Sequence, residues 1–366
     1  MAAPGQLMAL ASPKDYVVRN LRLDAEPIQL ADQLIQHALT LSSSDIHIEP
    51  YEKNCRIRYR QDGLLQKIAE IPAHQASGLI TRLKVMAKMD IAERRLPQDG
   101  RFQLEKIDVR MNTCPTLYGE KAVLRLLDTT NISLDIDSLG LHENQKKIFL
   151  KTITRPQGLI LVTGPTGSGK TVTLYSALNF LNKIEKNIST VEDPVEIELP
   201  GINQVNINPK INLTFSQVLR TFLRQDPDII MVGEIRDAET AKIAVQAAQT
   251  GHLVFSTLHT NSAIETLNRL QSLNIAPYNI IHSISLIISQ RLIRKSSING
   301  YLGRMAIFEL LTLSDNLSEL ILQNANTATL LSQAKNEGFS TLYENGLKKV
   351  SEGLTTLTEL HRVIQP

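Results

Sequence analysis

The chain has 366 residues, of which 21% are charged, and its formal net charge is +2. A chain of this length is too long to fold around one ordinary hydrophobic core, so we expect two domains. A net charge this close to zero excludes a strong overall positive potential, which would attract nucleic acid or an anionic membrane surface. No run of about 18 apolar residues occurs, and residues 1–16 lack the basic start of a signal peptide. We therefore expect contact with a membrane to be made only through partners.

The cysteine content argues against a structural metal. The two cysteines, Cys55 and Cys114, lie far apart in the sequence and match no metal-ligand spacing. Reduced thiols of a cytosolic protein are the simplest interpretation. We expect no zinc site.

The first 130 residues predict a leader and a small α+β domain. Residues 1–26 show no clear periodicity and are interpreted as a leader or linker. Apolar residues at helical spacing then predict a helix over residues 28–39, and the dipeptide Asp62-Gly63 predicts a hairpin between two alternating segments. With a further β region over residues 101–127, the predicted domain spans residues 27–130.

A strand with one polar face is predicted at residues 44–49. Ile46 and Ile48 lie on one face, and the other face carries three potential metal ligands, Asp45, His47 and Glu49. Nothing nearby in the sequence completes a metal site, so a solvated polar face is the favoured interpretation.

From residue 139 onward, buried-strand segments alternate with helix-length segments. The predicted strands are Leu159–Thr163, Ile188–Val191, Ile229–Val232 and Leu253–Leu258. This alternation predicts an α/β fold with a mostly parallel sheet covered by helices on both faces. Ligands of such sheets bind at the carboxyl ends of the strands. The predicted core spans residues 139–295, after a linker at 131–138, and a mainly helical extension at 296–366 follows it.

The first of these strands leads into a phosphate-binding loop. Residues 164–171 fit the pattern G-x-x-x-x-G-K-[ST], whose backbone N–H groups cradle nucleotide phosphates. The helix predicted after the loop points its N-terminus at the anion. We expect Lys170 to reach the β- and γ-phosphates and the Thr171 hydroxyl to ligate Mg²⁺. The predicted nucleotide-binding residues are Gly164, Pro165, Thr166, Gly167, Ser168, Gly169, Lys170, Thr171 and Val172.

Acidic residues and a histidine follow the other three strands. The segment Thr190–Glu196 places three carboxylates where one could orient and deprotonate a water; acidic decoration of a loop is the alternative. Gly233 stands where a Walker-B aspartate is usual, so Glu234 is expected to hold Mg²⁺ through water. His259, after the fourth strand, is either a γ-phosphate sensor or an ordinary hydrogen-bonded residue.

Together these motifs resemble the secretion ATPase superfamily, and within it the type II secretion and type IV pilus assembly ATPases. The resemblance covers nearly everything from about residue 26 to the end. Beyond the phosphate loop, the segments that carry it are Ser44–Pro50, Asp62-Gly63, Arg95–Arg101, Glu192–Glu196, Gly233-Glu234, Thr250–His259, Gln290–Leu292, Gly300–Arg304 and Gly353–Thr356. The resemblance implies a P-loop NTPase with a RecA-like core, preceded by a PAS-like α+β domain.

The resemblance also implies the roles of individual residues. By this resemblance Glu196 is the general base and Glu234 is the Walker-B glutamate. His252 and His259 are the two histidines of a His box. Arg110 and Arg125 match two arginines of the N-terminal domain that contact the phosphates in the family. Arg125 also lies in an otherwise apolar strand, where an arginine needs an anionic partner.

Two family features are missing from the sequence. Many assembly ATPases carry a four-cysteine zinc module after the segment that matches Gln290–Leu292, and this sequence has no cysteine there. The N-terminal domain that docks to the inner-membrane platform leaves at most a tail in residues 1–26.

The resemblance implies a cytoplasmic ATPase motor at the inner face of the bacterial inner membrane. It implies a hexamer that couples Mg-ATP hydrolysis to type IV pilus assembly or type II protein secretion through a platform protein. The alternatives are a pilus retraction ATPase, a nucleic-acid translocase of related fold and a non-catalytic scaffold. Neutral net charge argues against the translocase, and intact catalytic residues argue against the scaffold.

Overall fold

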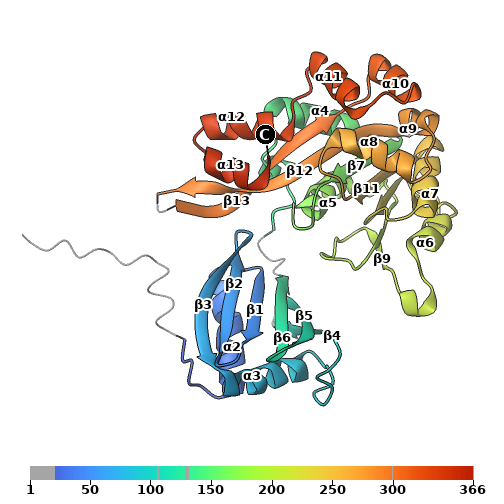
Figure 1. Cartoon of the computed structure of the whole chain (residues 1–366). Helices are drawn as coiled ribbons and strands as arrows, with labels where there is room; N and C mark the ends of the chain where they lie inside the picture. The colour runs from blue at the N-terminus through green and yellow to red at the C-terminus, as the bar shows by residue number, and fades with distance from the viewer. Residues whose placement is uncertain (1–20, 105–106, 128–131, 299, 366) are drawn as a thin grey trace, which may run out of the picture. The chain divides into compact units, whose positions relative to one another are not determined.

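A computed structural model describes residues 21–104, 107–127, 132–298 and 300–365 (Figure 1). The chain forms two compact units that divide in sequence between residues 131 and 132. We call them the N-terminal unit and the C-terminal unit and describe each by itself. The first 20 residues of the predicted leader, and the first residue of the predicted linker, lie outside the described residues.

The N-terminal unit is a six-stranded antiparallel sheet with two helices on one face, in the strand order β3-β2-β1-β6-β5-β4. Its elements are α2 Pro27–Thr40, β1 Asp45–Pro50, β2 Asn54–Gln61, β3 Leu64–Pro72, α3 Ala73–Met86, β4 Gln98–Leu104, β5 Ile107–Thr116 and β6 Gly119–Leu127. The predicted helix is α2, and the predicted hairpin joins β2 to β3. Asp62 and Gly63 both have positive φ, 47° and 84°, which a two-residue hairpin turn of this kind requires.

The polar face of β1 is not solvated, contrary to the sequence-based expectation. Asp45 and Glu49 are each only 5% exposed. Glu49 accepts hydrogen bonds from Arg56 at 3.1 Å and Arg58 at 2.7 Å, and it pairs with Lys121 at 3.1 Å. Burial opposes ionisation of Glu49, but hydrogen bonds from these cations outweigh it and lower its pKa to about 2. The cations come from neighbouring strands, which the pattern of a single strand cannot show.

The C-terminal unit contains a seven-stranded sheet in the order β13-β12-β7-β11-β10-β8-β9. Each neighbouring pair is parallel except β12 with β13. The strands are β7 Gly158–Thr163, β8 Ile188–Glu192, β9 Asn203–Asn206, β10 Ile229–Val232, β11 Leu253–Leu258, β12 Ile284–Ser297 and β13 Gly300–Leu311. The four predicted strands are β7, β8, β10 and β11, so the mostly parallel sheet is confirmed. The sequence analysis did not predict β9, β12 or β13.

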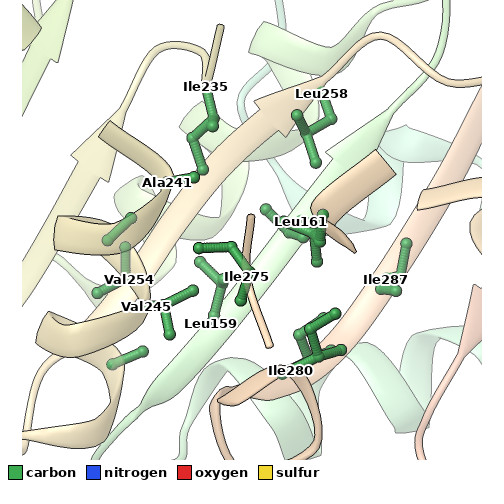
Figure 2. Packing of buried hydrophobic residues seen from close by; sticks show 14 of the residues in the cluster. Leu159, Leu161, Ile235, Ala241, Val245, Val254, Leu258, Ile275, Ile280 and Ile287 are labelled. Carbon is green, nitrogen blue, oxygen red and sulfur yellow. The ribbon is translucent and has the colours of Figure 1, made fainter. Parts of the chain in front are cut away.

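Helices cover both faces of this sheet, because its central strands are apolar on both sides. On β7, Ile160 and Val162 belong to one buried cluster with residues of α4 (Glu143–Ile153) and α5 (Lys170–Leu181). Leu159 and Leu161 belong to another cluster, with residues of α7 (Ala238–Gln249), α8 (Ala263–Ser272) and α9 (Pro277–Ser283) (Figure 2). The helical elements are η1 Ile136–Leu139, α4 Glu143–Ile153, α5 Lys170–Leu181, η2 Pro209–Ile211, α6 Phe215–Phe222, α7 Ala238–Gln249, α8 Ala263–Ser272, α9 Pro277–Ser283, α10 Asp315–Leu322, α11 Thr327–Asn336, α12 Leu342–Ser351 and α13 Leu357–Val363.

Both ends of the C-terminal unit differ in detail from the predicted organisation. Residues 136–139 overlap the predicted linker, yet they form η1 and bury Ile136 and Leu139 in the core of this unit. The region from 296 onward was predicted to be mainly helical. It begins with the last two residues of β12 and contains the whole of β13, and α10 to α13 follow (Figure 1).

Side-chain caps fix where two helices next to the carboxyl edge of the sheet begin. The Asp237 carboxylate accepts a hydrogen bond from the backbone N–H of Thr240 and starts α7. The Ser262 hydroxyl accepts one from Glu265 and starts α8. Each cap satisfies a donor that the first helical turn leaves unpaired. The loops before these helices are therefore short and have fixed ends.

Candidate nucleotide-binding site

The phosphate loop lies between β7 and α5 and depends on glycines at its sharp bends. Gly164, Gly167 and Gly169 have φ values of 143°, 78° and 88°, which residues with a side chain rarely adopt. A Cβ on Gly164 would lie 2.5 Å from the carbonyl oxygen of Gln290, and one on Gly169 would lie 2.8 Å from the Gln290 side-chain amide nitrogen. The loop is therefore held against β12, and only glycine fits at either end.

The Lys170 ammonium lies inside this loop. Its Nζ donates hydrogen bonds to the carbonyl oxygens of Gly164 at 2.8 Å and Pro165 at 3.0 Å. Burial lowers the pKa of Lys170 to about 8, and the nearby Glu234 carboxylate opposes this shift. The loop thus holds a positive charge in a partly desolvated position, where an incoming phosphate interacts with it strongly.

Glu234 and His259 follow neighbouring strands β10 and β11 at the same edge of the sheet. Glu234 accepts a hydrogen bond from Arg236 at 2.5 Å, and its other oxygen lies 3.5 Å from His259 Nε2. Burial opposes ionisation of Glu234, but Arg236 and then His259 outweigh it and hold its pKa below the ordinary value. A Cβ at Gly233 would lie 3.3 Å from backbone atoms of β8, a contact tighter than is usual for a side chain.

The acidic segment at the end of β8 contains three carboxylates, of which Glu192 is buried, Asp193 is exposed and Glu196 is intermediate. Glu192 is 4% exposed and accepts hydrogen bonds from Thr190 at 2.6 Å, from Gln204 at 3.3 Å and from the Tyr175 hydroxyl. Burial raises the pKa of Glu192 above its ordinary value. Glu196 is only half-buried, and its backbone N–H donates to the same Tyr175 hydroxyl at 3.3 Å. Tyr175 therefore connects the helix after the phosphate loop to both acids.

The oxygen donors at this edge suit Mg²⁺. Thr171 offers a hydroxyl in the first turn of α5, and Glu234 offers a carboxylate whose pKa favours the ionised form. Mg²⁺ bound with phosphates needs one or two carboxylates and keeps several waters. Two further hydroxyls, those of Thr163 and Ser168, are buried without a hydrogen-bond partner. Within the described ranges, no three His, Cys, Asp or Glu side chains gather as a metal site.

His252 is not brought to this edge within its own chain. It immediately precedes β11, and its carbonyl accepts a hydrogen bond from Gly158 at the start of β7. His259 follows the other end of β11, so the two histidines lie at opposite edges of the sheet. His252 Nδ1 instead lies 3.1 Å from the carbonyl oxygen of Ala247. Its role as a site residue stays a prediction.

Comparison with known proteins identifies the family. The family model described as Type II/IV secretion system protein matches residues 22–362. The chain belongs to this family. Type IV pilus assembly ATPase PilB of Acinetobacter baylyi is 47% identical over 94% of this chain and 67% of the relative. Type II secretion system protein E of Xanthomonas campestris pv. campestris is 42% identical over 95% of this chain and 69% of the relative.

A solved structure supports the same assignment. The crystal structure of the pilus retraction motor PilT with bound ADP is 30% identical in sequence, with a TM-score of 0.68, over 91% of this chain and 96% of that chain. Membership of the type II/IV secretion system protein family confirms the predicted α/β fold and the predicted enzyme class, an ATP hydrolase. No helix among the described residues combines the length and apolarity needed to cross a bilayer.

Two further predicted site residues of this family member lie in the N-terminal unit. Arg110 on β5 and Arg125 on β6 are directly opposite each other in register. Arg125 Nε lies 3.1 Å from the buried Asp45, and Arg110 Nε lies 3.7 Å from Asp108. The Arg125 side chain is still 56% exposed. Like charges across two strands repel, which favours an anion beside them; phosphate contact stays a prediction.

Several residues of the site had no role in the sequence analysis. Gln290 and Arg291 belong to a segment that carries the family resemblance, but its pattern gives no hint that β12 touches the phosphate loop. Tyr175 lies four residues after Thr171 in the same helix, and this spacing alone could have suggested a place on the same helix face. Arg236 lies two residues after Glu234, which is a weak signal for an ion pair.

Proposed function

We propose that the chain is an ATP-driven motor of a type IV pilus assembly or type II secretion machine. The observation that carries the proposal is the meeting of three strand ends at one edge of the sheet. The phosphate loop follows β7, Glu234 follows β10 and His259 follows β11, while an electrostatic interaction links Glu234 with Lys170. A cation for the phosphates beside a carboxylate for the metal is the arrangement that phosphoryl transfer needs.

Each residue at this edge then has a distinct task. Lys170 binds the β- and γ-phosphates, and the backbone N–H groups of the loop surround them. Glu196 accepts a proton from the attacking water, since it is more accessible than the buried Glu192, and Asp193 is paired with Arg236 at 3.6 Å. Thr171 and Glu234 hold Mg²⁺, the latter through water. Bound Mg²⁺ supplies charge neutralisation at the phosphate oxygens. His259 responds to the γ-phosphate.

The motor function requires the two units to act together. Arg110 and Arg125 are proposed to contact the ATP phosphates, so that binding favours one orientation of the units and hydrolysis releases it. Copies of the chain are proposed to close into a ring, with six as the number in the family, because head-to-tail contacts close when the rotation allows it. An inner-membrane platform protein is the proposed receiver of the motion, which places the chain at the cytoplasmic face of that membrane.

Phosphate release by the purified chain tests the enzymatic part. We expect release that depends on Mg²⁺ and ATP and that is lost in Lys170→Ala. Double-stranded and single-stranded DNA should leave the rate unchanged, and stimulation by DNA would favour a translocase instead. Binding of ATP without any Mg²⁺-dependent turnover would favour a non-catalytic scaffold. Vesicles of anionic lipid added to the same assay show whether the chain responds to a membrane without a partner.

Disruption of the gene in its own cell tests the biological part. We expect loss of surface pili or of secreted proteins, restored by the intact chain and not by the Lys170→Ala variant. Retained secretion and piliation in the disrupted strain would contradict the proposal. Pili that persist and fail only to retract would identify a retraction motor.

A further inference from the structure

Strand β12 contacts the phosphate loop at both of its ends through one residue. Gln290 is 2% exposed, and its carbonyl oxygen and side-chain amide are the atoms that a side chain at Gly164 and Gly169 would strike. The Gln290 Oε1 atom also accepts a hydrogen bond from the Thr173 hydroxyl at 2.7 Å, in the first turn of α5. The loop therefore packs closely against β12 at its start and at its end, and a hydrogen bond joins β12 to the helix that follows.

The next residue on β12 extends this contact to a second loop. Arg291 is 9% exposed. One terminal nitrogen of its guanidinium donates to the carbonyl oxygen of Gln290 at 3.0 Å, and the other donates to the carbonyl oxygen of Asn261 at 3.0 Å. Asn261 lies two residues after His259. A planar guanidinium holds two acceptors at a fixed separation, which the single ammonium of a lysine does not do.

The segment after His259 is anchored on its other side as well. The Asn261 N–H donates to the Glu265 carboxylate at 3.0 Å. The N–H of Ala263 donates at 2.5 Å to Glu309 on β13, and the other oxygen of Glu309 accepts from Leu342 at the start of α12 at 2.8 Å. With α8 anchored in this way, Arg291, together with a longer hydrogen bond from the Ser289 hydroxyl to the Asn261 carbonyl at 3.4 Å, ties residues 259–263, called here the His259 segment, to the strand that contacts the phosphate loop.

We propose that Gln290 and Arg291 are positioning residues that hold the phosphate loop and the His259 segment at one spacing, so that His259 distinguishes a bound triphosphate from a diphosphate. The inference rests on the proposed function and assigns a task to two residues to which that function gives none. Gln290 shapes the loop itself and therefore affects ATP and ADP alike. Arg291 acts through the His259 segment and therefore affects the response to the γ-phosphate.

The test uses the full chain and three arginine variants, Arg291→Met, Arg291→Lys and Arg294→Met. Arg294 is the matched control, because it lies on the same strand and donates to Glu359 on α13, at 2.9 and 2.6 Å, outside the site. We expect Arg291→Met to bind ADP within about threefold of the wild type and to lose the preference for ATP. Its kcat should fall about 10²-fold, as small misplacements in a site do, with partial recovery in Arg291→Lys.

The control should lose thermal stability and keep both the nucleotide preference and the kcat of its folded fraction. A preference for ATP that survives in Arg291→Met, or an equal loss in Arg294→Met, would overturn the inference. A wild type without Mg²⁺-dependent hydrolysis counts against the proposed function instead, since the ratio of ATP to ADP affinity is measured independently of turnover.

Two more variants separate a positioning role from general damage. Combined with His259→Ala, the Arg291→Met change should add little further loss of kcat, because both act through one segment. Fully additive losses of kcat would contradict a shared route through that segment.

Thr173→Val removes only the hydroxyl that donates to Gln290, and we expect ATP and ADP affinities to fall together by about fivefold. Unchanged affinities would overturn the part assigned to Gln290.

Discussion

Lys170 is the residue whose charge responds most directly to pH. Burial lowers its pKa to about 8, so the ammonium is present below pH 8 and is lost as the pH rises above it. A bound triphosphate favours the charged form. We therefore expect ATP affinity to fall as the pH rises from 8 toward 10, and binding above pH 8 to take up a proton. Titration calorimetry in buffers of different ionisation enthalpy measures both quantities.

The matched variant for this prediction is Lys170→Ala. It keeps the backbone N–H groups of the loop but removes the point charge and both hydrogen bonds to the loop carbonyls. The proton uptake should disappear, triphosphate affinity should fall and hydrolysis should be abolished. Unchanged ATP turnover in this variant would refute the assignment of the site.

The two glutamates of the acidic segment are expected to differ in kind. Glu196→Gln should retain Mg-ATP binding while hydrolysis falls by about 10²–10⁴-fold, the usual effect of a positioned base. Glu192→Gln places an amide where Thr190, Tyr175 and Gln204 all donate, so we expect it mainly to lower the melting temperature. The hydrolysis rates and melting temperatures of both variants test this difference between Glu192 and Glu196. If only Glu192→Gln is inactive at full stability, the roles are reversed.

Among the elements, α13 contacts β12 through the buried acid Glu359 and through Leu360, which packs in one cluster with Ile293. The Glu359 side chain is fully buried and pairs with Arg294 and Arg362 at 2.6 and 2.7 Å. Burial opposes its ionisation, but hydrogen bonds from Arg362 and Arg294 outweigh it and lower the pKa to about 2. The unfolded carboxyl titrates near 4.5, so this contribution to stability is complete above pH 4.5 and is lost as the pH falls toward 2.

We therefore expect Glu359→Gln to be less stable than the wild type at neutral pH, with the difference in melting temperature shrinking between pH 4.5 and 2. Thermal unfolding of both proteins across this range tests the prediction. Glu337, on the surface near α11, is a useful comparison, since it is exposed and its replacement by Gln should leave the melting temperature almost unchanged. A difference in melting temperature that stays the same at all pH values would contradict the proposed link between protonation of Glu359 and stability.

For the whole molecule, the proposed arginine contacts make the N-terminal unit part of the enzyme. A fragment of residues 132–366 contains the complete parallel sheet and both sides of its core, so we expect it to fold and to bind nucleotide. A start at Leu139 would delete Ile136, which is buried in that core. Without Arg110 and Arg125 the fragment should hydrolyse ATP about 10³-fold more slowly than the full chain.

Single changes of the two arginines complete this test. Arg110→Ala and Arg125→Ala should reduce hydrolysis as the truncation does, without preventing assembly. Loss of Arg125 also leaves the buried Asp45 with fewer partners, so circular dichroism must show that the N-terminal unit is intact. A fragment that turns over ATP as fast as the full chain at equal concentration would contradict the proposed contact.

The sequence was sufficient for the parts of the molecule whose signal is local. The helix α2, the Asp62-Gly63 turn and the four apolar strands β7, β8, β10 and β11 all follow from spacing and turn chemistry. The phosphate loop and Glu234 follow from motifs at strand ends. Contacts between distant segments were not predictable in this way. The partners of Asp45 and Glu49, and the support that Gln290 gives the loop, depend on which strands become neighbours.

Strand β12 is the clearest example of an element that local sequence signals do not predict. It is long and mostly buried, yet it follows the short helix α9 directly and ends in a polar hairpin, so no turn signal marks its start. The role of His252 stays a prediction, because one motif contains both histidines but does not say where the fold places each of them. The six extended residues of β11 separate them to opposite edges.

The double cap formed by Glu309 has a consequence for how this sequence can change in evolution. One carboxylate closes the starts of two helices whose first residues, Ala263 and Leu342, are far apart in the chain. Glutamine would present N–H groups to one of these amides, and aspartate is shorter by one methylene group, so neither neighbour in chemistry serves both helices. A change at this position would leave both buried N–H groups with a poorer acceptor at the same time, although each helix keeps its own cap, Ser262 or Thr341. One substitution at Glu309 would therefore disturb a helix of the ATPase core and one of the C-terminal helices together.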